Sequence, residues 1–148
     1  MMKRLVYPLA LSLGLLAHSA AALEFRSVKE TGVALYEAPA LTSKKLFVVS
    51  RYYPVEVLSS QKEWSRVRDA TGGIAWIPAA ALSKQRWLLI TVDKAEVRAT
   101  PANDGPLAYT VPKDGVVELQ DPPKGGWVKV RHRDGSIGYA RITDLWGL

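Results

Sequence analysis

The chain has 148 residues, of which 48% are hydrophobic and 23% are charged, a composition typical of a folded protein rather than a disordered one. It contains no cysteine, which excludes disulfide bonds, thiolate metal sites and a cysteine nucleophile. The formal net charge of +6 is spread along the sequence without a block of like charges, so we expect no nucleic-acid partner.

The first 22 residues have the pattern of a secretory signal peptide. The basic start MMKR precedes an uncharged apolar stretch that ends in small residues, with Ala20 and Ala22 forming an A-x-A cleavage site. A retained membrane anchor is the alternative, because the stretch is just long enough to span a bilayer. Pro8 and His18 interrupt it, so we expect cleavage of residues 1–22 and no stable membrane insertion afterwards. The expected location is periplasmic, with full secretion as the alternative.

The rest of the chain contains an internal repeat. Residues 25–82 align with residues 87–145 at an offset of 62 that becomes 63 after the middle. The matched positions are mainly apolar, Gly, Pro and Trp positions, such as Trp64 with Trp127. We therefore expect a first repeat at 23–83 and a second repeat at 84–148.

Each repeat consists of short segments rich in β-branched and aromatic residues, separated by turn signals. The clearest strand segments lie at 46–50, 55–59, 64–69 and 74–77, and then at 107–111, 116–120, 127–132 and 137–140. No segment after the first 22 residues has a sustained helical period. The sequence predicts an all-β fold of two tandem small five-stranded barrels after a cleaved signal peptide. Packing of one repeat against the other is expected, because about sixty residues are near the lower limit for an independent core.

The second repeat resembles a bacterial SH3 (SH3b) domain. EVRATP at 96–101 resembles that family's Val-Arg-x-x-Pro stretch, and residues 112–145 resemble its Lys-x-Gly turn, Gly-Trp-x-x-Val strand, Gly-(Trp/Tyr) strand and closing Leu. The first repeat is more divergent: ALYEAP at 34–39 resembles the opening of eukaryotic SH3 domains, and RYYP replaces the Lys-x-Gly turn. The resemblance implies SH3-like barrels that act as binding modules, usually for cell-wall or peptide ligands.

Candidate binding residues follow from strand alternation in the segments WSRVR and WVKVR. Successive side chains point to opposite faces, so each tryptophan shares its face with two basic residues. Such an indole can stack on sugars or peptide planes while the cations meet carboxylates. Tyrosines in the first repeat's loops, and the arginine that replaces one of them in the second, would complete two unlike grooves. The candidate ligand-binding residues are Tyr36, Tyr53, Trp64, Arg66, Arg68, Arg98, Trp127, Lys129 and Arg131.

Other arrangements of the aromatic residues remain open. Trp64 and Trp127 could instead cap an open barrel end or cover the seam between the repeats. Trp76 and Tyr139 follow the small residues Ala75 and Gly138, which favours a place in the core or the seam.

No catalytic, metal or cofactor site is expected. His132, Asp134 and Ser136 alternate in HRDGS, but Asp134 and Gly135 form a hairpin turn, so the three side chains need not converge as a triad requires. His132 is the only histidine after the expected cleavage site, which leaves too few nitrogen ligands for zinc or copper.

The sequence thus predicts an exported non-catalytic module that recognises peptidoglycan or a cell-envelope protein. The alternative is a structural spacer or a subunit of an envelope complex, with both tryptophans at the seam.

Overall fold

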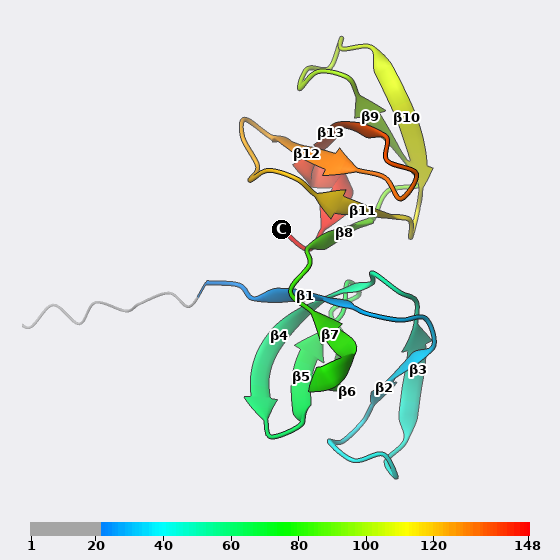
Figure 1. The fold of residues 1–148 in the computed structure, drawn as a ribbon, viewed down its shortest axis with the longest axis vertical. Helices are drawn as coiled ribbons and strands as arrows, with labels where there is room; N and C mark the ends of the chain where they lie inside the picture. Colours follow the sequence, from blue (N-terminus) through cyan, green and yellow to red (C-terminus); the bar gives the residue numbers. More distant parts are fainter. Residues whose placement is uncertain (1–21) are drawn as a thin grey trace, which may run out of the picture.

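The computed structural model describes residues 22–148, which form two lobes stacked end to end (Figure 1). The signal peptide expected at residues 1–22 lies, except for its last residue, outside the described part of the chain. Over the described residues, no helix has the length and apolar character to cross a membrane. The secondary structure there is β-strand, with two single-turn 3-10 helices.

The first repeat forms one seven-stranded antiparallel sheet. Its elements are β1 (Phe25–Val28), β2 (Val33–Tyr36), β3 (Lys45–Val49), β4 (Pro54–Gln61), β5 (Trp64–Arg68), β6 (Ile74–Pro78), the 3-10 turn η1 (Ala79–Ala81) and β7 (Leu82–Ser83). The strand order is β3-β2-β6-β5-β4-β1-β7. The sheet bends so that its concave face encloses a small core.

The second repeat has the same strand order, β10-β9-β13-β12-β11-β8-β14, as a duplication requires. Its elements are β8 (Trp87–Ile90), β9 (Lys94–Arg98), β10 (Leu107–Pro112), β11 (Val116–Leu119), β12 (Trp127–Arg131), β13 (Ile137–Arg141), the 3-10 turn η2 (Ile142–Asp144) and β14 (Leu145–Trp146). The all-β class and the tandem arrangement of two related units are therefore confirmed.

Each sheet has seven strands where five were expected in each barrel. The additional pairing comes from the two ends of the repeat. The opening segment contributes two separate strands, and the 3-10 turn that closes the repeat is followed by a two-residue strand. In the first repeat this short strand, β7, pairs antiparallel with β1, and in the second β14 pairs with β8. The sheet therefore contains both ends of its own repeat.

Each lobe has its own hydrophobic core, made by the inward side chains of alternating strand residues. In the first lobe the largest fully buried side chains include Leu35 and Ile77, and in the second Leu88 and Ile90. Val67 and Val130, at matching positions of the two repeats, are 1% and 0% exposed. The valines of the two tryptophan-bearing strands are thus core residues, and the opposite face of each strand is turned outward.

A third cluster joins the lobes. Trp87, Leu89 and Val116 of the second repeat are buried against Tyr52, Tyr53 and Ala70 of the first. The rings of Tyr52 and Trp87 stack with centroids 3.9 Å apart. The Trp87 amide donates a hydrogen bond of 3.0 Å to Ser27 Oγ, and the Phe25 and Trp146 rings meet edge to face at 5.2 Å. The expected packing between the repeats is therefore present.

Candidate functional site

The second repeat carries a groove of about 480 Å³ beside Trp127. Its lining combines aromatic rings, prolines and charged groups: Pro101, Asp121, Pro122, Lys124, Gly125, Trp127, Lys129 and Tyr139. Trp127 begins β12 and Tyr139 lies on β13, where it is the register partner of Lys129. The alternation of β12 buries Val128 and Val130 and leaves Trp127 half-buried on the outer face, as its sequence predicts. Two aromatic side chains therefore reach the groove from adjacent strands.

The loop before β12 forms one wall of this groove. Lys124 and Trp127 form an isolated β-bridge, in which each main-chain N–H donates to the other's carbonyl, at 2.8 and 3.1 Å. The two residues between them, Gly125 and Gly126, have φ angles of 61° and 83°, a region that glycine adopts without a steric cost. The tight turn holds Pro122 and Lys124 next to the indole.

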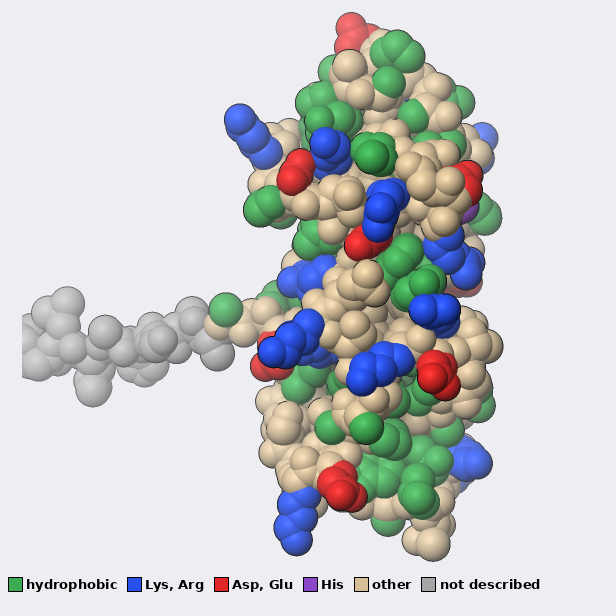
Figure 2. Space-filling view, viewed as in Figure 1, with side chains coloured by type: hydrophobic (Ala, Val, Ile, Leu, Met, Phe, Trp, Pro, Cys, Tyr) green, Lys and Arg blue, Asp and Glu red, His purple; other side chains and the backbone are tan. Residues whose placement is uncertain are grey.

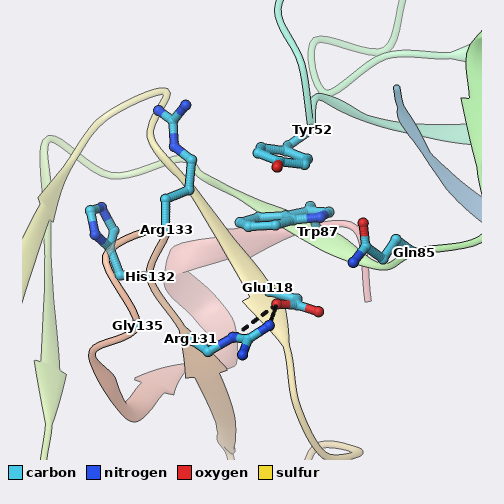
Figure 3. Close-up of a pocket in the computed structure, with 8 residues that line it drawn as sticks. All are labelled: Tyr52, Gln85, Trp87, Glu118, Arg131, His132, Arg133 and Gly135. Carbon is cyan, nitrogen blue, oxygen red and sulfur yellow. Dashed lines mark hydrogen bonds and ion pairs between the residues drawn. The ribbon is translucent and has the colours of Figure 1, made fainter. Parts of the chain in front are cut away.

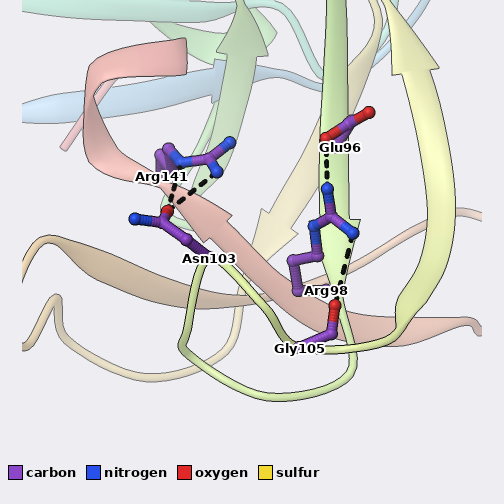
Figure 4. Close-up of polar contacts among 5 residues, drawn as sticks. All are labelled: Glu96, Arg98, Asn103, Gly105 and Arg141. Carbon is purple, nitrogen blue, oxygen red and sulfur yellow. Dashed lines mark hydrogen bonds and ion pairs between the residues drawn. The ribbon is translucent and has the colours of Figure 1, made fainter.

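Arg141 supports the groove from the other side. Its guanidinium lies 5.1 Å from the Trp127 ring centroid. Its Nε and Nη2 donate to Asn103 Oδ1 at 3.1 and 2.8 Å, which ties the loop that carries Pro101 to β13 (Figure 4). One arginine thus holds both the indole and the opposite loop in place.

Arg98, a predicted ligand-binding residue, has a structural position instead. Its guanidinium pairs with Glu96 and donates to the Gly105 carbonyl at 3.2 Å (Figure 4). The side chain is 19% exposed and fastens the two ends of the loop between β9 and β10. Arg98 does not line the Trp127 groove. At the position where the first repeat has Tyr36, the second repeat therefore has an arginine that anchors the loop between β9 and β10.

Charges around the groove are only partly compensated. Lys129 Nζ lies 4.0 Å from Asp121 Oδ2, a contact between exposed groups that contributes little free energy. Lys124 has no ion pair among the described residues. Arg131, predicted to act with Trp127, is engaged elsewhere, because its Nε donates to Glu118 at 3.0 Å and its Nη2 also binds that carboxylate. The ammonium groups of Lys124 and Lys129 are therefore the cations that a ligand in this groove would meet.

The first repeat has a different groove, of about 560 Å³, beside Trp64. It is mainly apolar and is lined by Leu41, Glu63, Trp64, Pro78, Ala79 and Ala80. The ring of Tyr36 packs edge to face on that of Trp64, with the centroids 5.3 Å apart. Tyr36 is only 7% exposed, so it is a buried support for the indole. The structure brings the predicted pair Tyr36 and Trp64 together, without a basic side chain in the groove lining.

The remaining predicted residues of the first repeat lie apart from this groove. Arg66 is exposed on β5, opposite Trp76 on β6. Arg68 pairs with Glu56 on the neighbouring strand, at 2.7 Å. Tyr53 belongs to the seam, where the Ala70 amide donates to its hydroxyl at 3.4 Å and burial raises the pKa of the phenol. The prediction that Tyr53 and Trp64 line one groove was therefore wrong.

Two further expectations about aromatic residues were wrong. Trp76 and Tyr139 are half-buried on the outer faces of β6 and β13, not in a core or at the seam. The seam is formed by Trp87 and Tyr52, and the cluster that joins the lobes contains neither Trp64 nor Trp127. Pro101, Pro122, Lys124 and Arg141 were missed as groove residues. The compact DPPKGG loop directly before a tryptophan was the signal that could have found Pro122 and Lys124, whereas Pro101 and Arg141 lie outside it.

The HRDGS segment forms a turn. Asp134 Oδ1 accepts a 2.8 Å hydrogen bond from the Ser136 amide and lies 3.3 Å from His132 Nδ1. The hydrogen bonds from Ser136 lower the pKa of this exposed carboxyl. Asp134 thus holds the turn, as the hairpin prediction implies. Within residues 22–148, no group of three or more His, Cys, Asp or Glu side chains is arranged to hold a metal ion.

Comparison with protein families gives a match in each repeat. Profiles described as "Bacterial SH3 domain" match residues 31–83 and residues 91–147. A search of curated proteins gives no significant match.

Solved structures with a similar fold include NlpC2 and NlpC1 from Trichomonas vaginalis and an NlpC/P60 family protein from Bacillus cereus. Their sequence identities are 21%, 20% and 13%, with TM-scores of 0.40, 0.40 and 0.39. The alignments cover 88%, 88% and 83% of this chain and 50%, 48% and 56% of those chains. The chain thus spans about half the length of these structures.

Proposed function

Because the chain belongs to the bacterial SH3 domain family, we propose that it is an exported, non-catalytic module that binds peptidoglycan or an envelope peptide. Members of this family often bind cell-wall material, which is the general class of partner we adopt here. The periplasm is the proposed location, on the strength of the signal-peptide pattern in residues 1–22.

The Trp127 groove is the observation that carries this proposal. It offers two aromatic rings, two prolines and two ammonium groups in one concave surface. Flat rings suit the apolar faces of sugars and peptide planes, and ammonium groups suit the carboxylates of wall peptides. The first repeat's groove has Trp64 without a lining cation, so the second repeat is assigned the main binding role.

The test is co-sedimentation with purified peptidoglycan at low salt. Trp127→Ala should weaken binding by about thirtyfold, the effect of truncating a central aromatic contact. Trp64→Ala is the matched control, because it removes the same side chain from the equivalent strand position, and it should change binding less than threefold. Circular dichroism of both variants checks that the fold is intact. Failure of the wild type to sediment with the wall polymer at low salt would leave only an envelope peptide or protein as ligand, and equal effects of the two variants would refute the assignment to the second repeat.

Lys124→Gln/Lys129→Gln tests the ligand's charge. If carboxylates meet these ammonium groups, the double variant should weaken binding about tenfold at low salt and much less at 0.5 M salt, because screening suppresses exposed pairs. An unchanged salt dependence would mean that the cations do not contact the ligand.

The structural alternative, a rigid spacer or complex subunit, draws support from the buried seam between the lobes. The seam contains the stacked rings of Trp87 and Tyr52, and not Trp64 and Trp127 as this alternative first assumed. Iodide quenching separates the two functions: added wall fragments should protect Trp127 if the groove binds them and should leave quenching unchanged if the chain only spaces other components.

A further inference from the structure

Tyr52 has an unusual backbone conformation at the seam. Its φ of 72° lies in the left-handed region, which residues other than glycine, and bulky ones above all, rarely adopt. The Tyr52 amide donates to the Val28 carbonyl at 2.8 Å, and the ring stacks on Trp87 of the other repeat. A residue held in such a conformation is a reason to look for function nearby.

Two arginines from opposite repeats lie around the Tyr52 ring. The guanidinium carbon of Arg51 is 4.7 Å from the ring centroid, and that of Arg133 is 6.0 Å from it. Both side chains are exposed, and neither makes an ion pair among the described residues. Figure 3 shows Arg133 extending beside the stacked rings, away from the ion pair of Arg131 with Glu118. Folding thus brings two guanidinium groups from different repeats to the same aromatic ring.

Cavities open next to both guanidinium groups. One of about 390 Å³ is lined by Arg51 and Arg133 together, with Thr31 and Ser50 contributing hydroxyl groups. A second, of about 320 Å³, is lined by Arg133 together with Gln85 and His132 (Figure 3).

The only carboxylate that lines the first cavity is that of Asp114. In the second cavity the carboxylate is that of Glu118, which is already bound to Arg131. Two guanidinium groups outweigh the single carboxylate of the first cavity. Figure 2 likewise shows several Lys and Arg side chains around the waist between the lobes.

We propose that the seam binds a phosphate group between Arg51 and Arg133. Guanidinium groups donate paired hydrogen bonds to oxyanions. A single arginine satisfies a carboxylate, whereas a tetrahedral phosphate has oxygens and charge for two arginines that approach from different sides. The ligand would contact both repeats at once. This site is separate from the Trp127 groove and does not depend on the proposed wall binding.

The experiment is isothermal titration calorimetry of the full chain with inorganic phosphate at pH 7.5 and constant ionic strength. Arg51→Gln/Arg133→Gln should weaken binding about a hundredfold, about tenfold for each lost charged hydrogen-bond partner. Lys44→Gln/Lys94→Gln is the matched control: it removes one exposed cation from each repeat outside the seam and should bind as the wild type does. Trp127→Ala should also bind phosphate normally, which separates this site from the groove.

Glycerol phosphate in a parallel titration distinguishes an esterified phosphate from the free dianion, and tighter binding of either one identifies the source. Acetate tests the choice of phosphate over carboxylate and should bind at least tenfold more weakly. The proposal is overturned if the wild type binds neither phosphate compound, if the arginine double variant binds as tightly as the wild type, or if acetate binds as tightly as phosphate.

Discussion

Trp87 and Trp127 both lie on the side of their strand that faces away from the second core, and they differ in exposure because only Trp87 is covered by the other lobe. All four residues of β8 are buried: Leu88 and Ile90 belong to the second core, whereas Trp87, which is 5% exposed, belongs to the cluster at the seam. In β12 the valines occupy the core face and Trp127 points outward. The same side chain therefore stabilises the lobe contact in one strand and remains available to a ligand in the other.

Tyr109 gives a prediction about alkaline pH. It packs against the second core, and its burial, together with the negative charge of Asp134, raises the pKa of the phenol to about 12. In the unfolded chain the phenol ionises near pH 10, so between pH 10 and about 12 the folded state holds a proton that the unfolded state has lost. The free energy of unfolding should therefore fall as pH rises through this window.

Urea unfolding at pH 8, 10 and 11.5 measures this effect. The wild type should lose more stability between pH 10 and 11.5 than Tyr109→Phe, which has no phenol to ionise at that position. Parallel pH profiles of the two proteins would contradict the prediction.

At the level of elements, the two repeats differ where β6 and β13 pass closest to the neighbouring strand. Ala75 of β6 is 3% exposed, and its counterpart in β13 is Gly138. A Cβ atom at Gly138 would lie 2.6 Å from Val97 Cγ1 and 2.8 Å from the Arg98 carbonyl oxygen. The second repeat thus requires glycine because β9 approaches β13 more closely than alanine allows.

Gly138→Ala should lower the free energy of unfolding by about 1–3 kcal/mol, the usual cost of inserting a group into a packed site. Chemical denaturation measures the change. Gly135→Ala is an informative comparison, because Gly135 has open space around its Cβ position but a φ of 93°. It should also destabilise, through backbone strain alone and without shifting β9. A neutral Gly138→Ala variant would show that β9 moves away easily.

At the scale of the whole molecule, the seam makes the two small lobes into one body. Each lobe has a core of its own, but β8 is shared between the second core and the seam, and Ser27 and Phe25 of the first repeat contact Trp87 and Trp146 of the second. Units of about sixty residues are marginal alone, so burial at the seam adds stability to both. This arrangement also fixes the grooves of the two repeats relative to each other.

The wild type should therefore unfold in a single calorimetric transition, with equal calorimetric and van't Hoff enthalpies. Trp87→Ala should reduce stability by about 3–5 kcal/mol, the range for removal of a buried aromatic side chain, and should broaden or divide the transition. Two well-separated transitions in the wild type would show that the lobes unfold independently.

Local sequence patterns were sufficient to predict much of the fold and the direction of the two groove tryptophans. Alternating apolar residues predicted which face of β5 and β12 is buried, since a strand's two-residue period requires no knowledge of its partners. The outward direction of Trp64 and Trp127 follows from the same local rule, whereas the duplication was visible in the alignment of the two halves and the β class in their β-branched and aromatic segments. The extra strand β7 was not predicted, because a two-residue strand pairs through its backbone and has little sequence signal.

The composition of the sites depended on distant contacts. The neighbouring strand decides that Arg131 is paired, because it presents Glu118, whereas Lys124 has no such partner and lines the groove. Tyr53 was separated from Trp64 because packing of the second lobe turns the first lobe's loop into the seam. The sequence alone determined the repeat, the β class and the faces of the strands. Only the tertiary structure decided which side chains meet, because these contacts join residues far apart in the chain.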